Sequence, residues 1–218
     1  MFSEFATFFK DGGAWMYPIL AVFAVGTAIC IERIVYLQWT KSRNKKVWDE
    51  IYPLISASKF RQAADVVRED NTAIARVISY GLERARTARR QDDVEMAMEE
   101  GLMEATPRLE ARTSYISTLA NVATLLGLLG TIFGLIEAFD AVANADPASK
   151  ADLLSAAISI AMNTTAFGLV VAIPLLLAHT FITSMANKIT DSMEMATVKF
   201  MNIFRSVMAK QENGKTDA

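Results

Sequence analysis

The sequence predicts an all-α integral membrane protein with three transmembrane helices. Of its 218 residues, 52% are apolar and only 21% are charged. Three windows carry no Asp, Glu, Lys or Arg: 12–31, 113–136 and 153–187. Each window is long enough to cross a bilayer, which takes about 20 mostly apolar residues.

The composition also excludes several classes of protein. The chain is too apolar for a disordered protein, and a net charge of −2 does not fit a nucleic-acid binder. One cysteine, Cys30, and one histidine, His179, cannot form an internal disulfide, a thiolate metal site or a Cys-His nucleophile. We therefore expect no catalytic residues, no metal, no cofactor and no nucleic-acid partner.

Residues 1–11 precede the first charge-free window and are rich in phenylalanine. Phe2, Phe5 and Phe9 recur at helical spacing, which is typical of a short interfacial helix on the outer membrane face. A frayed aromatic tail fits the same pattern equally well. Glu4 and Asp11 stand where a cleavable signal peptide would carry positive charge, so no signal peptide is predicted.

The first transmembrane helix is predicted over 12–37, with aromatic residues at both ends. Trp15 and Tyr17 lie at its start, and Tyr36 and Trp39 at its end, as in the aromatic belts of membrane interfaces. Twenty of the 22 Lys and Arg residues fall within 33–112 and 188–218. By the positive-inside rule, the N-terminus and a loop over 141–152 lie outside, which in a bacterial inner membrane is the periplasmic side, and the C-terminus is cytoplasmic.

The segment 38–112 is predicted to be a cytoplasmic helical insert. Apolar residues recur at helical spacing over 47–55 and 74–82, and Asp92 and Asp93 favour a helix start. Pro107 is expected to kink the last helix. We expect the insert and the tail 188–218 to extend the second and third transmembrane helices into a cytoplasmic bundle. Its charges are interpreted as solvated helix surface.

The second transmembrane helix, 113–140, carries polar residues on one face. Ser117, Asn121, Thr124 and Thr131 follow one another at spacings of four, three and seven residues. The same stretch holds small residues that allow close helix packing, namely Gly127, Gly130 and Gly134.

The third window is too long for a single perpendicular crossing. Its 35 residues reach about 50 Å as a helix, against a hydrocarbon core of about 30 Å. The transmembrane helix and its extension, 153–187, should therefore tilt or leave the membrane. Gly168 is assigned to helix packing, and Pro174 is expected to bend the helix.

Thr131 and Thr165 are predicted to lie at the same depth, because they are about nine and about twelve residues from the outer ends of their helices. Antiparallel neighbours could then share a layer of hydroxyls. The alternative is that each hydroxyl bonds its own helix carbonyl four residues back. The candidate ion-pathway residues are Thr131, Thr165, Asn163, Thr164, Ser159 and Thr124.

The centres of the three windows hold no carboxylate. Ion-coupled membrane proteins commonly carry an ionisable group there, so a titrating group would have to come from another chain. Glu137, near the outer end of the second helix, is either an interfacial carboxylate or a residue at a channel mouth.

Two segments resemble the MotA/TolQ/ExbB proton channel family. Residues 126–136 read LGLLGTIFGLI, similar to that family's GLxGTxxG helix, and residues 163–174 read NTTAFGLVVAIP, similar to its TAxGLxxAIP helix. The three predicted transmembrane helices and the chain length resemble the ExbB/TolQ branch, whereas the flagellar stator branch has four.

This resemblance implies a homopentamer in the bacterial inner membrane, surrounded by lipid. Its central pore would hold a dimer of a single-span ExbD/TolR-like protein that supplies a proton-binding Asp. The family's pore threonines correspond to Thr131 and Thr165. A TonB/TolA-like protein would then transmit the work to outer-membrane transport.

At one position the sequence departs from the family pattern. Many ExbB-type chains have Glu five residues before the second threonine, where this chain has Ile160. Asn163 or Thr164 could compensate, and their neutral oxygens also leave sodium open as the ion. A stand-alone ion-coupled transporter and a non-conducting membrane scaffold remain alternatives. The resemblance does not distinguish an ExbB-like from a TolQ-like role.

Overall fold

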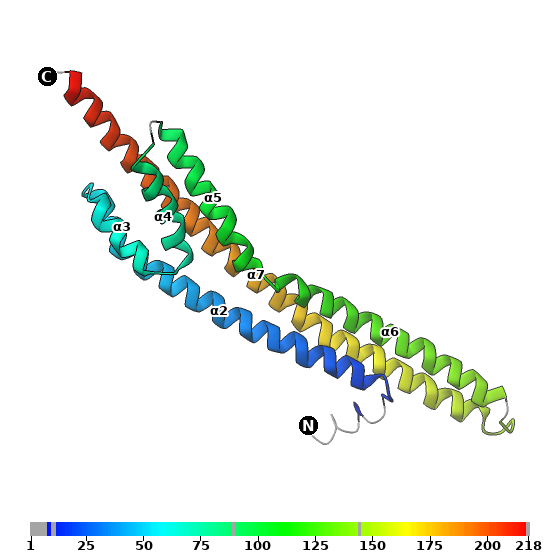
Figure 1. Ribbon diagram of the computed structural model, residues 1–218. Helices are drawn as coiled ribbons and strands as arrows, with labels where there is room; N and C mark the ends of the chain where they lie inside the picture. Colours follow the sequence, from blue (N-terminus) through cyan, green and yellow to red (C-terminus); the bar gives the residue numbers. More distant parts are fainter. Residues whose placement is uncertain (1–7, 10–11, 89, 144, 217–218) are drawn as a thin grey trace. The chain divides into compact units, whose positions relative to one another are not determined.

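The structure is a computed structural model that describes residues 8–9, 12–88, 90–143 and 145–216. For residues 210–216 only the backbone is described. Within the described residues the chain is built of helices, shown in Figure 1: α2 (Met16–Ser56), α3 (Phe60–Glu69), α4 (Ala73–Ala85), α5 (Gln91–Glu110), α6 (Thr113–Ala143) and α7 (Lys150–Thr216). Helices α2, α6 and α7 contain stretches long and apolar enough to cross a membrane. The predicted all-α class with three long apolar helices is confirmed.

The chain divides into two compact units. The first combines residues 1–33 with 112–182, and the second combines 34–111 with 183–218. Helices α2 and α7 contribute to both, whereas α3, α4 and α5 belong to the second alone.

The first unit contains α6, the first part of α7 and the first part of α2. Trp15 stacks on Phe133 of α6 with ring centroids 5.2 Å apart. Gly26 of α2 lies against Leu175 of α7, since a Cβ at Gly26 would come within 2.9 Å of the leucine methyl groups. Many large apolar side chains point outward, among them Leu177, which is 68% exposed. Such a surface suits lipid or another subunit.

Two described phenylalanines of the N-terminal segment belong to this unit. Phe9 packs edge-on against Phe167 of α7 at 5.8 Å and against Tyr17 at 5.3 Å, and Phe8 lies 6.4 Å from Phe167. The remainder of the interfacial helix predicted over 1–11 lies outside the described residues.

The second unit has a core of fully buried side chains from several helices. Ile55, Ile78, Met98 and Phe200 have no exposed surface. The ring of Phe200 stacks on that of Phe204, and the ring of Phe60 of α3 packs edge-on against Phe200. In both pairs the ring centroids are 6.2 Å apart. Burial of these aliphatic and aromatic side chains stabilises the fold of the charge-rich insert.

The helix boundaries in the second unit follow local chemistry. The Thr72 hydroxyl caps α4 by accepting a hydrogen bond from the backbone N–H of Ala75 at 3.3 Å. Asp92 and Asp93 lie in the first turn of α5, as predicted. Helix α5 runs through Pro107 to Glu110.

The second apolar helix, α6, begins only at Thr113. Arg112 separates it from α5 with a φ of 62°, in the left-handed region that interrupts a right-handed helix. We expected the second transmembrane helix to extend into the insert. In the structure the preceding part of the insert is a separate helix, α5. By contrast α2 and α7 continue without a break, to Ser56 and Thr216, so most of the predicted tail 188–218 is helical.

Candidate functional site

The hydroxyls of Thr131 on α6 and Thr165 on α7 are in direct contact. Thr165 donates to the backbone carbonyl of Gly127 on the opposite helix at 2.9 Å. Thr131 can donate to the same carbonyl at 3.1 Å or to the carbonyl of Ala161 on α7 at 3.3 Å. The pair thus bridges two helices through hydroxyls and backbone carbonyls.

The two hydroxyls have more acceptors in reach than protons to donate. Each carries one O–H and two lone pairs. When Thr165 donates to Gly127, its oxygen can still accept from Thr131, and Thr131 can instead turn to either of two carbonyls. Small rotations of two side chains therefore rearrange the network without leaving a proton donor unsatisfied. A chain of this kind can donate to, or accept from, a third group placed beside it.

Thr131 makes both kinds of contact expected from the sequence, one to its own helix and others to the neighbouring helix. Its bond to Gly127 is the bond to its own helix four residues back, while its contacts with Ala161 and Thr165 cross to the neighbour. Thr124 shows only the local bond, to Ala120 at 3.2 Å, and its side chain is exposed in the single chain.

Thr164 points to a different neighbour from Thr165. Its side chain is 1% exposed, and its hydroxyl donates to the carbonyl of Gly12 at 2.8 Å or to that of Ile160 at 3.1 Å. Successive residues of a helix are rotated by about 100°, so one of the two faces α6 and the other the start of the chain.

Of the six candidate ion-pathway residues, the structure brings together Thr131 and Thr165. Asn163 is half-buried, and Ser159 is exposed in the single chain. The sequence did not point to the carbonyls of Gly127, Ala161 and Gly12. Gly127 and Ala161 carried an indirect signal, because they lie four residues before Thr131 and Thr165, whereas Gly12 carried none.

The glycines explain how the hydroxyls reach across. A Cβ at Gly168 would lie 2.8 Å from the Ala123 carbonyl oxygen, and one at Gly127 would lie 3.3 Å from the Cα of Gly168. The backbones of α6 and α7 therefore approach one another closely at these two glycines, where a larger side chain would not fit without a shift.

The other two glycines of α6 lie next to further neighbours. A Cβ at Gly130 would collide with the methyl group of Thr164, and one at Gly134 would come within 3.2 Å of the Cβ of Ala161. Pro174 lies inside α7, which runs through it.

The surroundings of the threonine pair are uncharged. Residues 113–136 and 153–187 contain no Asp, Glu, Lys or Arg. Ile160, at the position of the family glutamate, is 42% exposed in the single chain and lies next to Gly13. In the described part of the chain, no cluster of three His, Cys, Asp or Glu side chains could hold a metal ion. The threonine pair itself offers hydrogen bonds and carries no charge.

Comparison with known proteins gives an independent view of the chain. It is 28% identical over 211 residues to a protein of Methanothermobacter thermautotrophicus named as a biopolymer transport protein ExbB homolog, covering 96% of this chain and 73% of that one. It is 32% identical over 107 residues to the Tol-Pal system protein TolQ of Haemophilus influenzae, covering 49% of this chain and 45% of that one. It is 29% identical over 103 residues to the biopolymer transport protein exbB1 of Vibrio cholerae, covering 47% and 45%.

The three apolar helices, together with these ExbB and TolQ relatives, indicate a multi-pass protein of the inner membrane. The sequence model of the MotA/TolQ/ExbB proton channel family matches residues 69–195, which is more than half of the chain and includes the threonine pair. With its three long apolar helices and its inter-helix hydroxyl network, the chain belongs to the MotA/TolQ/ExbB proton channel family.

Proposed function

We propose that this chain is the channel-forming subunit of a machine that converts the proton motive force into mechanical work, and that Thr131 and Thr165 line its proton path. The observation that carries the proposal is their direct contact across α6 and α7 within a stretch free of charge. Two adjustable hydroxyls in an apolar surrounding can hydrogen-bond either form of a carboxyl group as it gains and loses a proton.

The proton-binding group itself comes from a partner. A proton crossing the membrane needs a site at which it is bound and released, and this chain has no carboxylate in the apolar centres of its helices. An ExbD/TolR-like single-span protein with an intramembrane Asp would supply it, as a dimer held in a pentamer of this chain. The exposed apolar faces of α6 and α7 leave room for both kinds of contact.

In this scheme the proton motive force drives protons inward from the periplasm. By the positive-inside rule the insert and the C-terminus are cytoplasmic, so the protons first meet the loop between α6 and α7. Neutralising the partner Asp frees the dimer to move against the ring, and a TonB/TolA-like protein transmits the movement. One charge crossing 100 mV releases about 2.3 kcal/mol, so several protons would drive each mechanical step.

The test uses the full chain co-expressed with an ExbD/TolR-like single-span protein. Native mass spectrometry of the purified complex should give five copies of this chain with two of the partner. Proton flux into liposomes should fall about tenfold in Thr165→Val, the scale of one lost hydrogen bond to a charged group, with the same assembly.

Thr180→Val is the matched control, because Thr180 is on the same helix and its hydroxyl donates to its own Leu176 carbonyl at 3.1 Å. Flux by the single chain without any partner would favour a stand-alone transporter. Normal assembly with no flux by the wild-type complex would favour a scaffold. Flux that depends on a sodium gradient instead of a proton gradient would identify sodium as the conducted ion.

A further inference from the structure

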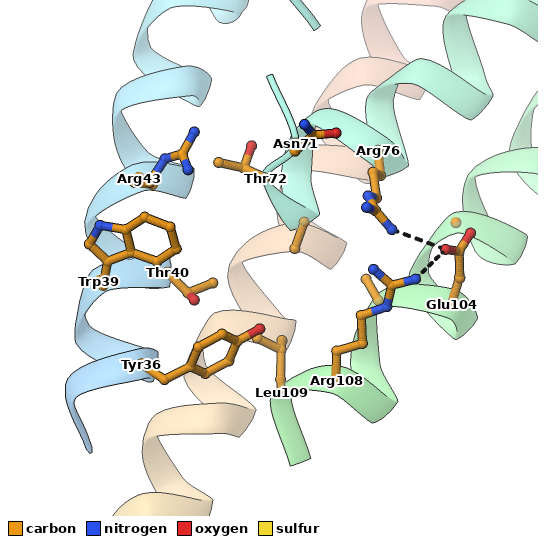
Figure 2. A pocket seen from close by; sticks show the side chains of 13 residues that line it. Tyr36, Trp39, Thr40, Arg43, Asn71, Thr72, Arg76, Glu104, Arg108 and Leu109 are labelled. Atoms are coloured by element: carbon orange, nitrogen blue, oxygen red, sulfur yellow. Dashed lines mark hydrogen bonds and ion pairs between the residues drawn. The ribbon is translucent and has the colours of Figure 1, made fainter. Parts of the chain in front are cut away.

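A cavity of about 210 Å³ lies inside the second unit, between α2, α4 and α5. Figure 2 shows Tyr36, Trp39, Thr40 and Arg43 entering it from α2, with Arg76 from α4 and Glu104 and Arg108 from α5. None of these residues takes part in the threonine network. The volume corresponds to several water molecules, since one water occupies about 30 Å³ of liquid, so a small polar group fits.

The lining of this cavity is positively charged. Three guanidinium groups, of Arg43, Arg76 and Arg108, face a single lining carboxylate, that of Glu104, which gives the lining a net charge of +2. Asp70, which holds Arg43 at 3.0 Å from outside the lining, reduces the local sum to +1. An excess of positive charge on donors of this shape favours a phosphate oxygen.

The carboxylate is already engaged. Glu104 accepts from Arg76 at 3.3 Å, from Arg108 at 3.0 Å and from the Tyr80 hydroxyl at 2.9 Å. The hydrogen bond to Glu104, together with the charge of this carboxylate, raises the pKa of Tyr80 above its ordinary value. Glu104 therefore orients Arg76 and Arg108. A guanidinium has five N–H donors, so Arg76 can hold Glu104 and still donate to a second anion.

Arg43 is oriented in the same way. Its guanidinium lies 4.8 Å from the centre of the Trp39 ring, and one of its nitrogens holds Asp70. Both Arg43 and Arg76 have 38% of their side-chain surface exposed, so they can be reached from outside. The lining residues Asn71, Thr72 and Ala73 form the start of α4, whose positive dipole end adds to the same potential.

The aromatic residues place the cavity at the membrane boundary. Tyr36 and Trp39 follow the first charge-free window within eight residues, and Trp39 is 58% exposed. Tyr and Trp concentrate at the level of lipid headgroups. Arg43 follows Trp39 by one helical turn, about 6 Å further along α2. The cationic lining therefore starts where the phosphates of the cytoplasmic leaflet would lie.

We propose that this cavity binds the phosphate group of an anionic phospholipid, with Arg43 and Arg76 as its main ligands and Tyr36 and Trp39 against the glycerol region. The inference rests on the membrane topology proposed above and not on proton conduction. A phosphate bound there bridges α2 to α4, so lipid composition would set how firmly the insert is held next to the membrane.

The test is native mass spectrometry of the detergent-solubilised full chain with added lipid. Phosphatidylglycerol should remain bound more strongly than zwitterionic phosphatidylethanolamine. The double variant Arg43→Gln, Arg76→Gln should lose about tenfold of this affinity, as expected for charge-assisted hydrogen bonds. The double variant Arg43→Lys, Arg76→Lys, which keeps the charge but not the planar donors, should lose less.

The matched control is the double variant Arg61→Gln, Arg68→Gln, which removes the same charge from exposed residues of α3 outside this cavity. An equal loss of phosphatidylglycerol in control and cavity variants would overturn the proposal, because binding would then reflect net charge alone. Inorganic phosphate that raises the unfolding temperature as much as phosphatidylglycerol would also overturn it, by assigning the cavity to a free anion. Unfolding temperatures of the variants without lipid show that each is folded.

Discussion

The hydroxyls of Thr131 and Thr165 contact each other and share one acceptor, the backbone carbonyl oxygen of Gly127. This oxygen lies 3.1 Å from the Thr131 hydroxyl and 2.9 Å from the Thr165 hydroxyl. One carbonyl oxygen has two lone pairs and can accept from both. The two residues are therefore parts of one hydrogen-bond network and should behave as one unit.

The first prediction is that Thr131→Val and Thr165→Val are not additive. Each single variant should lower proton flux by about tenfold, and the double variant should lower it little further, because either change dismantles the same network. Liposome flux of the complex with its single-span partner measures all three. Serine at either position keeps the hydroxyl and should keep most of the flux.

Thr180→Val combined with Thr131→Val provides the control for this cycle. Thr180 shares no partner with Thr131, so the two effects should add. If the fold-reduction of proton flux in the Thr131 and Thr165 double variant equals the product of the two single reductions, the two hydroxyls act separately.

The second prediction concerns the closest approach of α6 and α7. Gly168→Ala should destabilise the chain by about 1–3 kcal/mol, because its Cβ would lie 2.8 Å from the Ala123 carbonyl oxygen and one of the helices must shift. Thermal unfolding in detergent, followed by circular dichroism, measures the change.

Gly134→Ala is the comparison at the other end of the same helix pair. Its Cβ would lie 3.2 Å from the Cβ of Ala161, a smaller overlap than the 2.8 Å at Gly168, and alanine is the better helix former by about 1 kcal/mol. We expect this variant to differ little from the wild type. A Gly168→Ala protein as stable as Gly134→Ala would refute the close backbone contact.

The third prediction is a pH dependence that belongs to Asp70. Burial by itself would raise the pKa of this carboxyl, but hydrogen bonds from Thr72 and the guanidinium of Arg43 outweigh it and lower the pKa below its ordinary value. The distances are 2.7 Å from the Thr72 backbone nitrogen and 3.0 Å from Arg43.

A carboxyl whose pKa is lowered by folding stabilises the protein when it is ionised. This contribution is complete above the unfolded pKa of about 3.9 and is lost as the pH falls through the lower folded pKa. Asp70→Asn should therefore be about 1 kcal/mol less stable than the wild type at pH 7, the scale of one hydrogen bond, and this difference should shrink below pH 4. Asp65→Asn, which removes the same charge from an exposed position of α3, is measured beside it as the control. A difference that is the same at pH 7 and pH 3 would contradict the assignment.

Sequence reasoning predicted the threonine pair because the position of a residue along a helix follows from counting. Two antiparallel helices with a known outer end bring Thr131 and Thr165 to one level by their rise of about 1.5 Å per residue. The sequence could not give the partner of Thr164. Its acceptor, the Gly12 carbonyl, is 152 residues away and is a backbone group that any residue could supply.

The break before α6 was also beyond the reach of local signals. Pro107 is the residue that propensity marks as a helix breaker, yet α5 continues past it to Glu110. The chain turns instead at Arg112, a residue with no preference for the left-handed φ of 62° that it adopts. Tertiary packing decides such a position, and packing is not visible in residue types alone.

The bond from Thr164 to Gly12 has a consequence for the thickness of a channel wall. It fixes the start of α2, at Met16, near the level of the threonine pair, while α6 runs 12 residues further outward, about 18 Å, to Ala143. On the inner side of the pair each subunit contributes three helices, and on the outer side the described part of the chain contributes the hairpin of α6 and α7. A ring of such subunits would have a thick inner barrel and a thinner outer rim. In the proposed channel, the partner and its protons would therefore pass two-helix walls before the threonines and three-helix walls after them.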